Sequence, residues 1–131
     1  MDVTTILKQH GLKQTRLRVA LLGCFARAAH AQSYLDIKKE LGDTVDKSTL
    51  YRNLSAFESA GIIHRINDQS GIAKYAFGKV HDHGKHHAHF VCERCKTVYC
   101  IEAEQEVQLN VPNGFTTNDI QTVIKGTCVN C

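Results

Sequence analysis

Two pairs of cysteines with the same short spacing place the strongest constraint on how this chain folds. Cys92 and Cys95 form one CxxC pair and Cys128 and Cys131 form another, with 32 residues between the pairs. A two-residue spacer lets both sulfurs of a tight turn face one ion, and Zn²⁺ prefers four tetrahedral ligands, with thiolates at about 2.3 Å. The spacing therefore predicts a structural zinc site with no open position for catalysis.

Two disulfides or a redox motif are the alternatives for these cysteines. The N-terminal sequence lacks the basic start and apolar stretch of a signal peptide, and no apolar run approaches the ~20 residues that span a bilayer. We therefore expect a cytoplasmic protein with no membrane partner, in which disulfides seldom persist. A thioredoxin-type redox motif is disfavoured because there are two pairs and the helix-forming context is missing.

Charge and metal-binding residues divide the 131-residue chain into two parts. Residues 1–80 carry 12 Lys and Arg against 7 Asp and Glu, and residues 81–131 carry 4 against 6, which gives net charges of +5 and −2. Five of the six cysteines lie at or beyond residue 92, and five of the eight histidines lie between residues 81 and 89. The basic part indicates an anionic partner, with nucleic acid first in line. We predict domains at 1–80 and 81–131, with a hinge at 81–88.

Hydrophobic periodicity predicts four helices and then a hairpin in the first part. The helices are expected at about 4–11, 16–25, 34–41 and 49–60, with Thr15 and Ser33 as caps and Gly42 and Gly61 as stops. After Gly61 the pattern alternates, which predicts strands at 62–66 and 72–77. This order is typical of a winged helix-turn-helix.

The second part is expected to be α/β, which makes the fold class of the chain α+β. Strands are predicted at 87–92, 96–101 and 115–125, with a short acidic helix around 102–109.

The predicted helix at 49–60 is the candidate for reading DNA in the major groove. Its buried stripe is Leu50, Leu54 and Phe57, which leaves polar residues at its N-terminal end to face the groove. Arg18 and Lys38 are expected to be ordinary solvated charges. The predicted DNA-binding residues are Lys13, Arg16, Lys47, Ser48, Thr49, Tyr51, Arg52 and Asn53, with Arg65 and Lys74 of the hairpin as further backbone contacts.

A second metal site is predicted around an HxH motif. His87 and His89 alternate on one predicted strand, so both imidazoles face the same side. If the CERC turn joins this strand to the next as a hairpin, Cys100 comes near the pair, and His81 and His83 lie just upstream. This nitrogen and sulfur donor set favours Zn²⁺ over harder ions such as Mn²⁺. The alternatives are that Cys100 is a small buried hydrophobe, as expected for Cys24, and that the loop histidines are solvated.

The chain resembles the ferric uptake regulator (Fur) family of bacterial metalloregulators over nearly its whole length. The similarity lies in residues 11–16, His30, residues 48–54, residues 61–63, the run from His87 to Cys95, and the final CxxC pair. The resemblance implies a homodimer with an N-terminal winged-helix domain and a C-terminal dimerisation domain. It also implies a structural zinc on the four paired cysteines and a regulatory site on His30, His87, His89 and a linker residue, either His81 or His83.

Two departures from the family pattern bear on the metal that is sensed. Where iron- and peroxide-sensing members carry Asp or Glu, this chain has Cys100, and the linker ligand is a histidine instead of an acidic residue. Both changes replace hard oxygen with softer nitrogen or sulfur, which moves the prediction toward the zinc-sensing (Zur) branch. We therefore expect a zinc-responsive repressor, not an enzyme, that binds an inverted-repeat operator on double-stranded DNA; iron or manganese sensing is the alternative.

Two functions of other classes compete with a repressor. A zinc hydrolase would need an open metal position and a general base, and the chain has no HExxH motif. A metal buffer would only store zinc in the His-rich segment, which leaves the helix-turn-helix pattern and the basic first part without a role.

Overall fold

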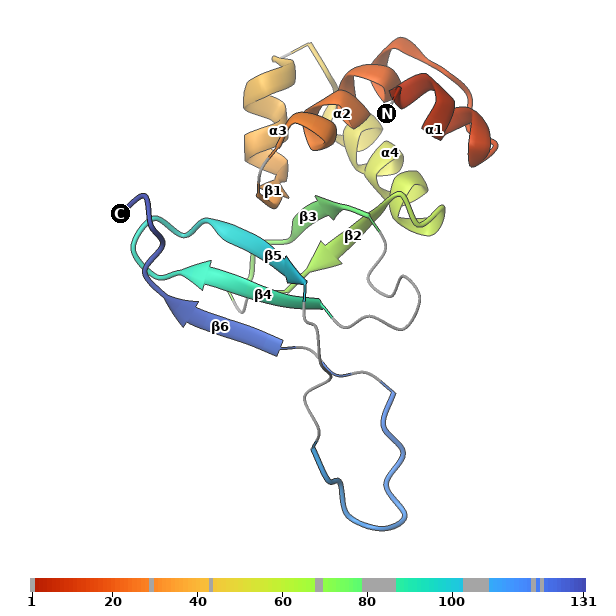
Figure 1. Cartoon of the computed structure of the whole chain (residues 1–131). Helices are drawn as coiled ribbons and strands as arrows, with labels where there is room; N and C mark the ends of the chain where they lie inside the picture. The colour runs from red at the N-terminus through yellow and green to blue at the C-terminus, as the bar shows by residue number, and fades with distance from the viewer. Residues whose placement is uncertain are drawn as a thin grey trace. The chain divides into compact units, whose positions relative to one another are not determined.

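The computed structural model describes residues 2–28, 30–42, 44–67, 70–78, 87–102, 109–118, 120 and 122–131, and it divides into two compact units, Met1–Lys79 and Val80–Cys131. Figure 1 shows the helices gathered in the first unit and a separate three-stranded sheet in the second. Among these residues, no helix combines the length and apolar character needed to cross a membrane.

Four helices and a small sheet make up the first unit. The elements are α1 (Val3–Gln9), α2 (Arg16–Arg27), β1 (Gln32–Ser33), α3 (Tyr34–Leu41), α4 (Lys47–Ser59), β2 (Ile63–Ile66) and β3 (Lys74–Phe77). The sheet has the order β1-β3-β2 with antiparallel pairing throughout. This arrangement confirms the winged helix-turn-helix fold, and among the described residues of this unit β1 is the one element that the sequence does not predict.

The predicted caps and stops explain why these helices begin and end where they do. The Thr15 side chain accepts the Arg18 N–H at 3.2 Å, and Ser33 with Asp36 forms a capping box at the start of α3. Gly61 follows α4 with φ of 77°, and the next residue, Ile62, donates to Phe57 O at 2.9 Å. That turn carries the chain directly from α4 into β2.

One face of each helix supplies the core of the first unit. The predicted stripe of Leu50, Leu54 and Phe57 is at most 1% exposed. It packs with residues of the other helices and the sheet: Ile6, Leu7, Leu21, Leu22, Phe25, Ile37, Ile62, Ile63 and Tyr75. The polar N-terminal end of α4 is thereby left on the surface.

The second unit is a three-stranded sheet with β4 in the centre. Its strands are β4 (His87–Cys92), β5 (Val98–Glu102) and β6 (Thr122–Gly126), in the order β5-β4-β6. β5 runs antiparallel to β4, and β6 runs parallel to it (Figure 1). The sheet thus places the residues that follow Cys92 and those that follow Gly126 at the same edge.

Two expectations for the second unit need correction. The strand expected at 115–125 covers only 122–126, because β4 offers six residues and the pairing from Ala88 to Cys92 uses Thr122 to Gly126. Residues 115–118 are exposed and outside any strand. Of the acidic helix expected at 102–109, Glu102 belongs to β5, Leu109 is not helical, and residues 103–108 lie outside the described residues.

Candidate metal centre and nucleic-acid interface

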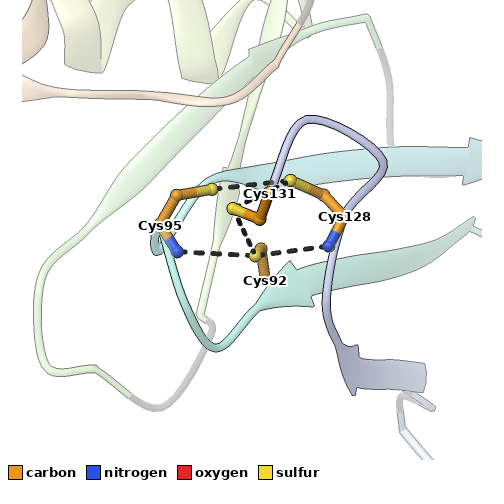
Figure 2. Close-up of side chains that lie close together, drawn as sticks. All are labelled: Cys92, Cys95, Cys128 and Cys131. Carbon is orange, nitrogen blue, oxygen red and sulfur yellow. Dashed lines mark hydrogen bonds between the residues drawn. The ribbon is translucent and has the colours of Figure 1, made fainter.

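The four paired cysteines converge on one point in the second unit. Cys92 ends β4, Cys95 lies in the turn that follows, and Cys128 and Cys131 follow β6 (Figure 2). Cys92 Sγ lies 3.8 Å from Cys131 Sγ, and Cys128 Sγ lies 3.7 Å from Cys95 Sγ and 3.6 Å from Cys131 Sγ. All four sulfurs lie within 4.8 Å of one another.

These separations fit a tetrahedral zinc ion. Thiolates at about 2.3 Å from Zn²⁺ in tetrahedral geometry lie about 3.8 Å from each other, which matches the distances in the cluster. A disulfide would bring two sulfurs to about 2.05 Å, and all six cysteines are free thiols. The donor set and its geometry therefore suit a structural Zn²⁺ held by Cys92, Cys95, Cys128 and Cys131.

Two backbone amides donate hydrogen bonds to the Cys92 sulfur of this cluster. The N–H groups of Cys95 and Cys128 both donate to Cys92 Sγ at 3.4 Å. They lower the pKa of the Cys92 thiol from 9.0 to about 6, because hydrogen bonds to the charged form favour it. The turn itself is closed by Lys96 N–H donating to Cys92 O at 2.8 Å. The fold thus favours a thiolate, the form that binds a metal, at this position.

Two of the residues predicted for the second metal site, His89 and Cys100, lie on the neighbouring strands β4 and β5. β4 and β5 form the expected hairpin, and its register places His89 opposite Cys100. Directly opposed residues of antiparallel strands lie on the same face of the sheet. The same register pairs His87 with Glu102 along the backbone.

The other residues predicted for this site lie in the first unit or outside the described residues. His30 is exposed in the first unit, where its Nδ1 lies 3.0 Å from Ala31 O and 3.3 Å from Gln32 Nε2. His81 and His83 lie outside the described residues. His64 is 4% exposed in β2, with Nδ1 2.8 Å from Gly78 O.

Most of the predicted DNA-binding residues lie exposed on α4 and at the start of α2. The exposed set consists of Lys13, Arg16, Lys47, Ser48, Tyr51 and Arg52, whereas Thr49 and Asn53 are half-buried. The hydroxyls of Ser48 and Thr49 both donate to Asp46 Oδ2 at the start of the helix. These bonds lower the pKa of the Asp46 carboxyl, Ser48 contributing most.

Asn53 is half-buried, and both ends of its side-chain amide are hydrogen-bonded. Its Oδ1 accepts from Arg18 Nε at 2.9 Å, and its Nδ2 donates to Thr49 O at 2.9 Å. The expectation that Arg18 is an ordinary solvated charge is therefore wrong. On the hairpin, Arg65 pairs with Glu58 at 3.2 Å.

Residues 9–124 match the sequence model of the ferric uptake regulator family, which is most of the chain. The chain belongs to the ferric uptake regulator family. The ferric uptake regulation protein of Neisseria gonorrhoeae is 35% identical to it over 136 residues, with 95% of this chain and 90% of the relative covered. The chain is therefore a Fur-family metal-responsive DNA-binding regulator.

Solved structures agree with this assignment. The Vibrio cholerae ferric uptake regulator superimposes with a TM-score of 0.66 at 26% identity, covering 95% of this chain and 98% of that one. A zinc uptake regulator complexed with zinc and DNA gives a TM-score of 0.68, covering 98% of this chain and 89% of that one. Its identity of 22% means that this second likeness shows the Fur-type fold alone.

The sequence patterns do not predict the roles of two residues in the helical unit of this Fur-type fold, Tyr34 and Arg18. Tyr34, the first residue of α3, stacks on Tyr51 of α4 with ring centroids 4.9 Å apart and an interplanar angle of 5°. Arg18 reaches Asn53 from α2. In both cases the partner lies on another helix, so the periodicity within one helix carries no signal for the contact.

Proposed function

We propose that this Fur-family chain is a transcriptional repressor that binds an inverted-repeat DNA operator as a homodimer, and does so when a divalent metal occupies a second site. The surface of α4 carries the proposal. Lys47, Ser48, Tyr51 and Arg52 are exposed at its N-terminal end, opposite the buried Leu50 stripe. Basic and polar side chains at that end of a recognition helix bind phosphates and base edges.

Iron is the first candidate for the sensed metal. The curated relative from Neisseria gonorrhoeae is named a ferric uptake regulation protein, and it aligns with 95% of this chain. The names of the relatives thus favour Fe²⁺ over the Zn²⁺ that the sequence predicts. The ligand set implied by the resemblance, His30, His81 or His83, His87, His89 and Cys100, stays a proposal.

Zinc is the second candidate, and one observation favours it. The β4–β5 register sets Cys100 opposite His89, which puts a sulfur donor and a nitrogen donor on one face of the sheet. Such a pair suits Zn²⁺ better than Fe²⁺ or Mn²⁺, whose sites in proteins use more oxygen. In either case, the four-cysteine cluster holds a separate structural Zn²⁺.

A DNA-binding titration distinguishes the two metals. The probe is a duplex that the metal-loaded chain selects from a random pool. Its affinity is measured against free Fe²⁺ under anaerobic conditions, Mn²⁺ and Zn²⁺, at one ionic strength because phosphate contacts depend on salt. Wild type is compared with Cys100→Ser, and Cys24→Ala is the control, since Cys24 lies in the core of the first unit at 1% exposure.

Each candidate gives a different result. A zinc sensor binds the duplex at the lowest free concentration of Zn²⁺ and loses most of that response in Cys100→Ser. An iron sensor responds to Fe²⁺ and Mn²⁺, and Cys100→Ser changes it little. If the metal-loaded wild type selects no duplex from the pool, the chain is not a DNA-binding repressor of this kind.

A further inference from the structure

The stacked tyrosines join α3 to the recognition helix. Tyr51 is 39% exposed on α4, and its ring lies parallel to that of Tyr34 at 4.9 Å. This spacing falls in the range of offset-stacked rings, an arrangement that stabilises an aromatic pair beyond the area it buries. One face of Tyr51 is therefore covered by Tyr34, while 39% of the residue remains exposed.

Two lysines surround the same ring. Lys38 Nζ lies 5.9 Å and Lys47 Nζ lies 5.8 Å from the centroid of the Tyr34 ring. Both separations are within the ~6 Å at which an ammonium group is attracted to an aromatic face. Lys38 is on α3 and Lys47 begins α4. The Tyr34 ring therefore has an ammonium group from each of these helices near it, beside Tyr51.

The hydroxyl of Tyr34 takes no part in this arrangement. Its oxygen is buried and has no hydrogen-bond partner among the described residues. A buried hydroxyl without a partner costs stability, so a tyrosine here is not explained by a polar contact. The contacts of the Tyr34 side chain with Tyr51, Lys38 and Lys47 are all made by its aromatic ring.

The backbone of Tyr34 is fixed before the ring is placed. Ser33 and Asp36 form the capping box that begins α3, with Ser33 N–H donating to Asp36 Oδ2 at 2.9 Å and Asp36 N–H donating to Ser33 Oγ at 3.2 Å. A ring on a fixed helix start restricts the rotamers of an exposed side chain that stacks on it. Tyr51 then loses less side-chain freedom when it binds.

From these contacts we propose that Tyr34 is a positioning residue for DNA recognition, which holds Tyr51 in the orientation that contacts the C5-methyl group of a thymine in the major groove. The inference rests on the proposed DNA-binding function. Thymine is the base whose methyl group offers an apolar contact there. Lys38 and Lys47, held near the same ring, contribute charge for adjacent phosphates.

The test uses the full-length metal-loaded chain and two probes. One is the duplex selected from a random pool, and the other is the same duplex with every thymine replaced by deoxyuridine, which lacks the methyl group. Affinities are measured for wild type, Tyr34→Ala, Tyr34→Phe, Tyr51→Ala and the double variant Tyr34→Ala/Tyr51→Ala. Leu35→Ala is the matched control, because Leu35 is the next residue of α3 and is 70% exposed.

Wild type is expected to bind the thymine duplex more tightly than the deoxyuridine duplex. Tyr34→Ala lowers affinity for the thymine duplex roughly fivefold and shrinks the preference for thymine, since an aromatic pair stabilises by about that factor. Tyr34→Phe and Leu35→Ala keep both the affinity and the preference. Once Tyr51 is alanine, Tyr34→Ala no longer changes the preference for thymine, and its remaining effect on affinity, through the lysines near the ring, is small and equal for both duplexes.

Three results overturn the inference while leaving DNA binding intact. They are equal wild-type affinity for the two duplexes, an unchanged preference in Tyr34→Ala, and an equal effect of Tyr34→Ala with or without Tyr51. Thermal melting of each variant identifies any loss of fold. Failure of the wild type to select a duplex overturns the proposed function as well, and is distinct from these three.

Discussion

Lys96 has a backbone conformation that residues other than glycine rarely adopt. Its φ is 66°, in the left-handed region, where a Cβ atom approaches the following carbonyl oxygen. The position lies directly after Cys95, and its N–H donates to Cys92 O at 2.8 Å to close the cysteine turn. Any residue with a Cβ is strained here, and the turn that holds two of the four clustered cysteines requires the conformation.

Replacing Lys96 with glycine is expected to stabilise the second unit. Relief of the left-handed strain amounts to about 1 kcal/mol, which raises the melting temperature of the zinc-loaded protein. Thermal melting at one fixed free Zn²⁺ concentration measures the effect. Lys96→Ala removes the same side chain but keeps the Cβ, so it gives no such increase; an equal increase in both variants would show that the side chain, not the backbone, is responsible.

The two arginines at the start of α2 are expected to differ in what they stabilise. Arg18 donates to Asn53 at 2.9 Å and is half-buried, whereas Arg16 is exposed. Arg18→Ala therefore lowers the free energy of unfolding by about 1.5–3 kcal/mol, since a hydrogen bond to a charged group contributes that much. Arg16→Ala leaves unfolding unchanged and weakens binding to the selected duplex.

Urea denaturation and a DNA-binding measurement on both variants check this pair. The effect of Arg18→Ala on unfolding should be smaller in an Asn53→Ala background, because the partner is then already missing. Equal losses of stability in Arg16→Ala and Arg18→Ala would contradict the assignment.

At the scale of elements, Gly126 allows β6 to pack against β4. A Cβ added at Gly126 would lie 3.1 Å from Phe90 Cζ and 3.3 Å from Phe90 Cε2. Gly126 O also accepts from Glu93 N–H at 2.8 Å, which ties the end of β6 to the first cysteine turn. The glycine thus lies where the sheet meets the cysteine cluster, two residues before Cys128.

Gly126→Ala is expected to destabilise the second unit by about 1–2 kcal/mol, because the Phe90 ring has to move. Thermal melting of the zinc-loaded variant measures the loss. Shortening the ring in Gly126→Ala/Phe90→Leu makes room for the new methyl group, so the double variant is less destabilised than the sum of the two single changes. Strict additivity would exclude the steric explanation.

The bounds of an element are predicted correctly from the sequence where the pattern that defines them lies within that element. α3 and β4 have the predicted bounds, because a cap and an alternating run define them locally. The bounds of β1 and β6 are not predicted from the sequence. β1 has only two residues and so shows no periodicity, and the length of β6 is set by its pairing with β4. For the site, CxxC spacing located the cysteine cluster, but no spacing in the sequence identifies the Tyr34–Tyr51 stack or the Arg18–Asn53 bond.

At the scale of the whole molecule, the two units have separate sources of stability. The hydrophobic core cluster lies between Ile6 and Tyr75, entirely within the first unit. The described part of the second unit offers few buried side chains, and Leu109, Val111, Phe115, Ile124 and Val129 are exposed. We therefore expect the proposed zinc on the four cysteines to contribute much of the stability of this small unit.

Loss of the proposed structural zinc is therefore expected to unfold the second unit and leave the first folded. In Cys92→Ser, or after a strong chelator, backbone amides of β4, β5 and β6 exchange rapidly with deuterium, while those of α2 and α4 stay protected. Hydrogen exchange followed by mass spectrometry reads both units in one sample. Cys24→Ala, which removes a thiol whose burial raises its pKa to about 11, leaves the exchange of the second unit unchanged. Simultaneous unfolding of both units would contradict this expectation.

The stacked tyrosines also give the molecule an optical reporter of its own. The chain has no tryptophan and only four tyrosines, so its intrinsic emission comes from tyrosine alone. Two of those four rings lie against each other on the proposed DNA-contacting side of the first unit, whereas Tyr75 is in the core and Tyr99 is on β5. An event that separates or reorients the stacked pair changes the emission, and it can be followed in the unlabelled protein.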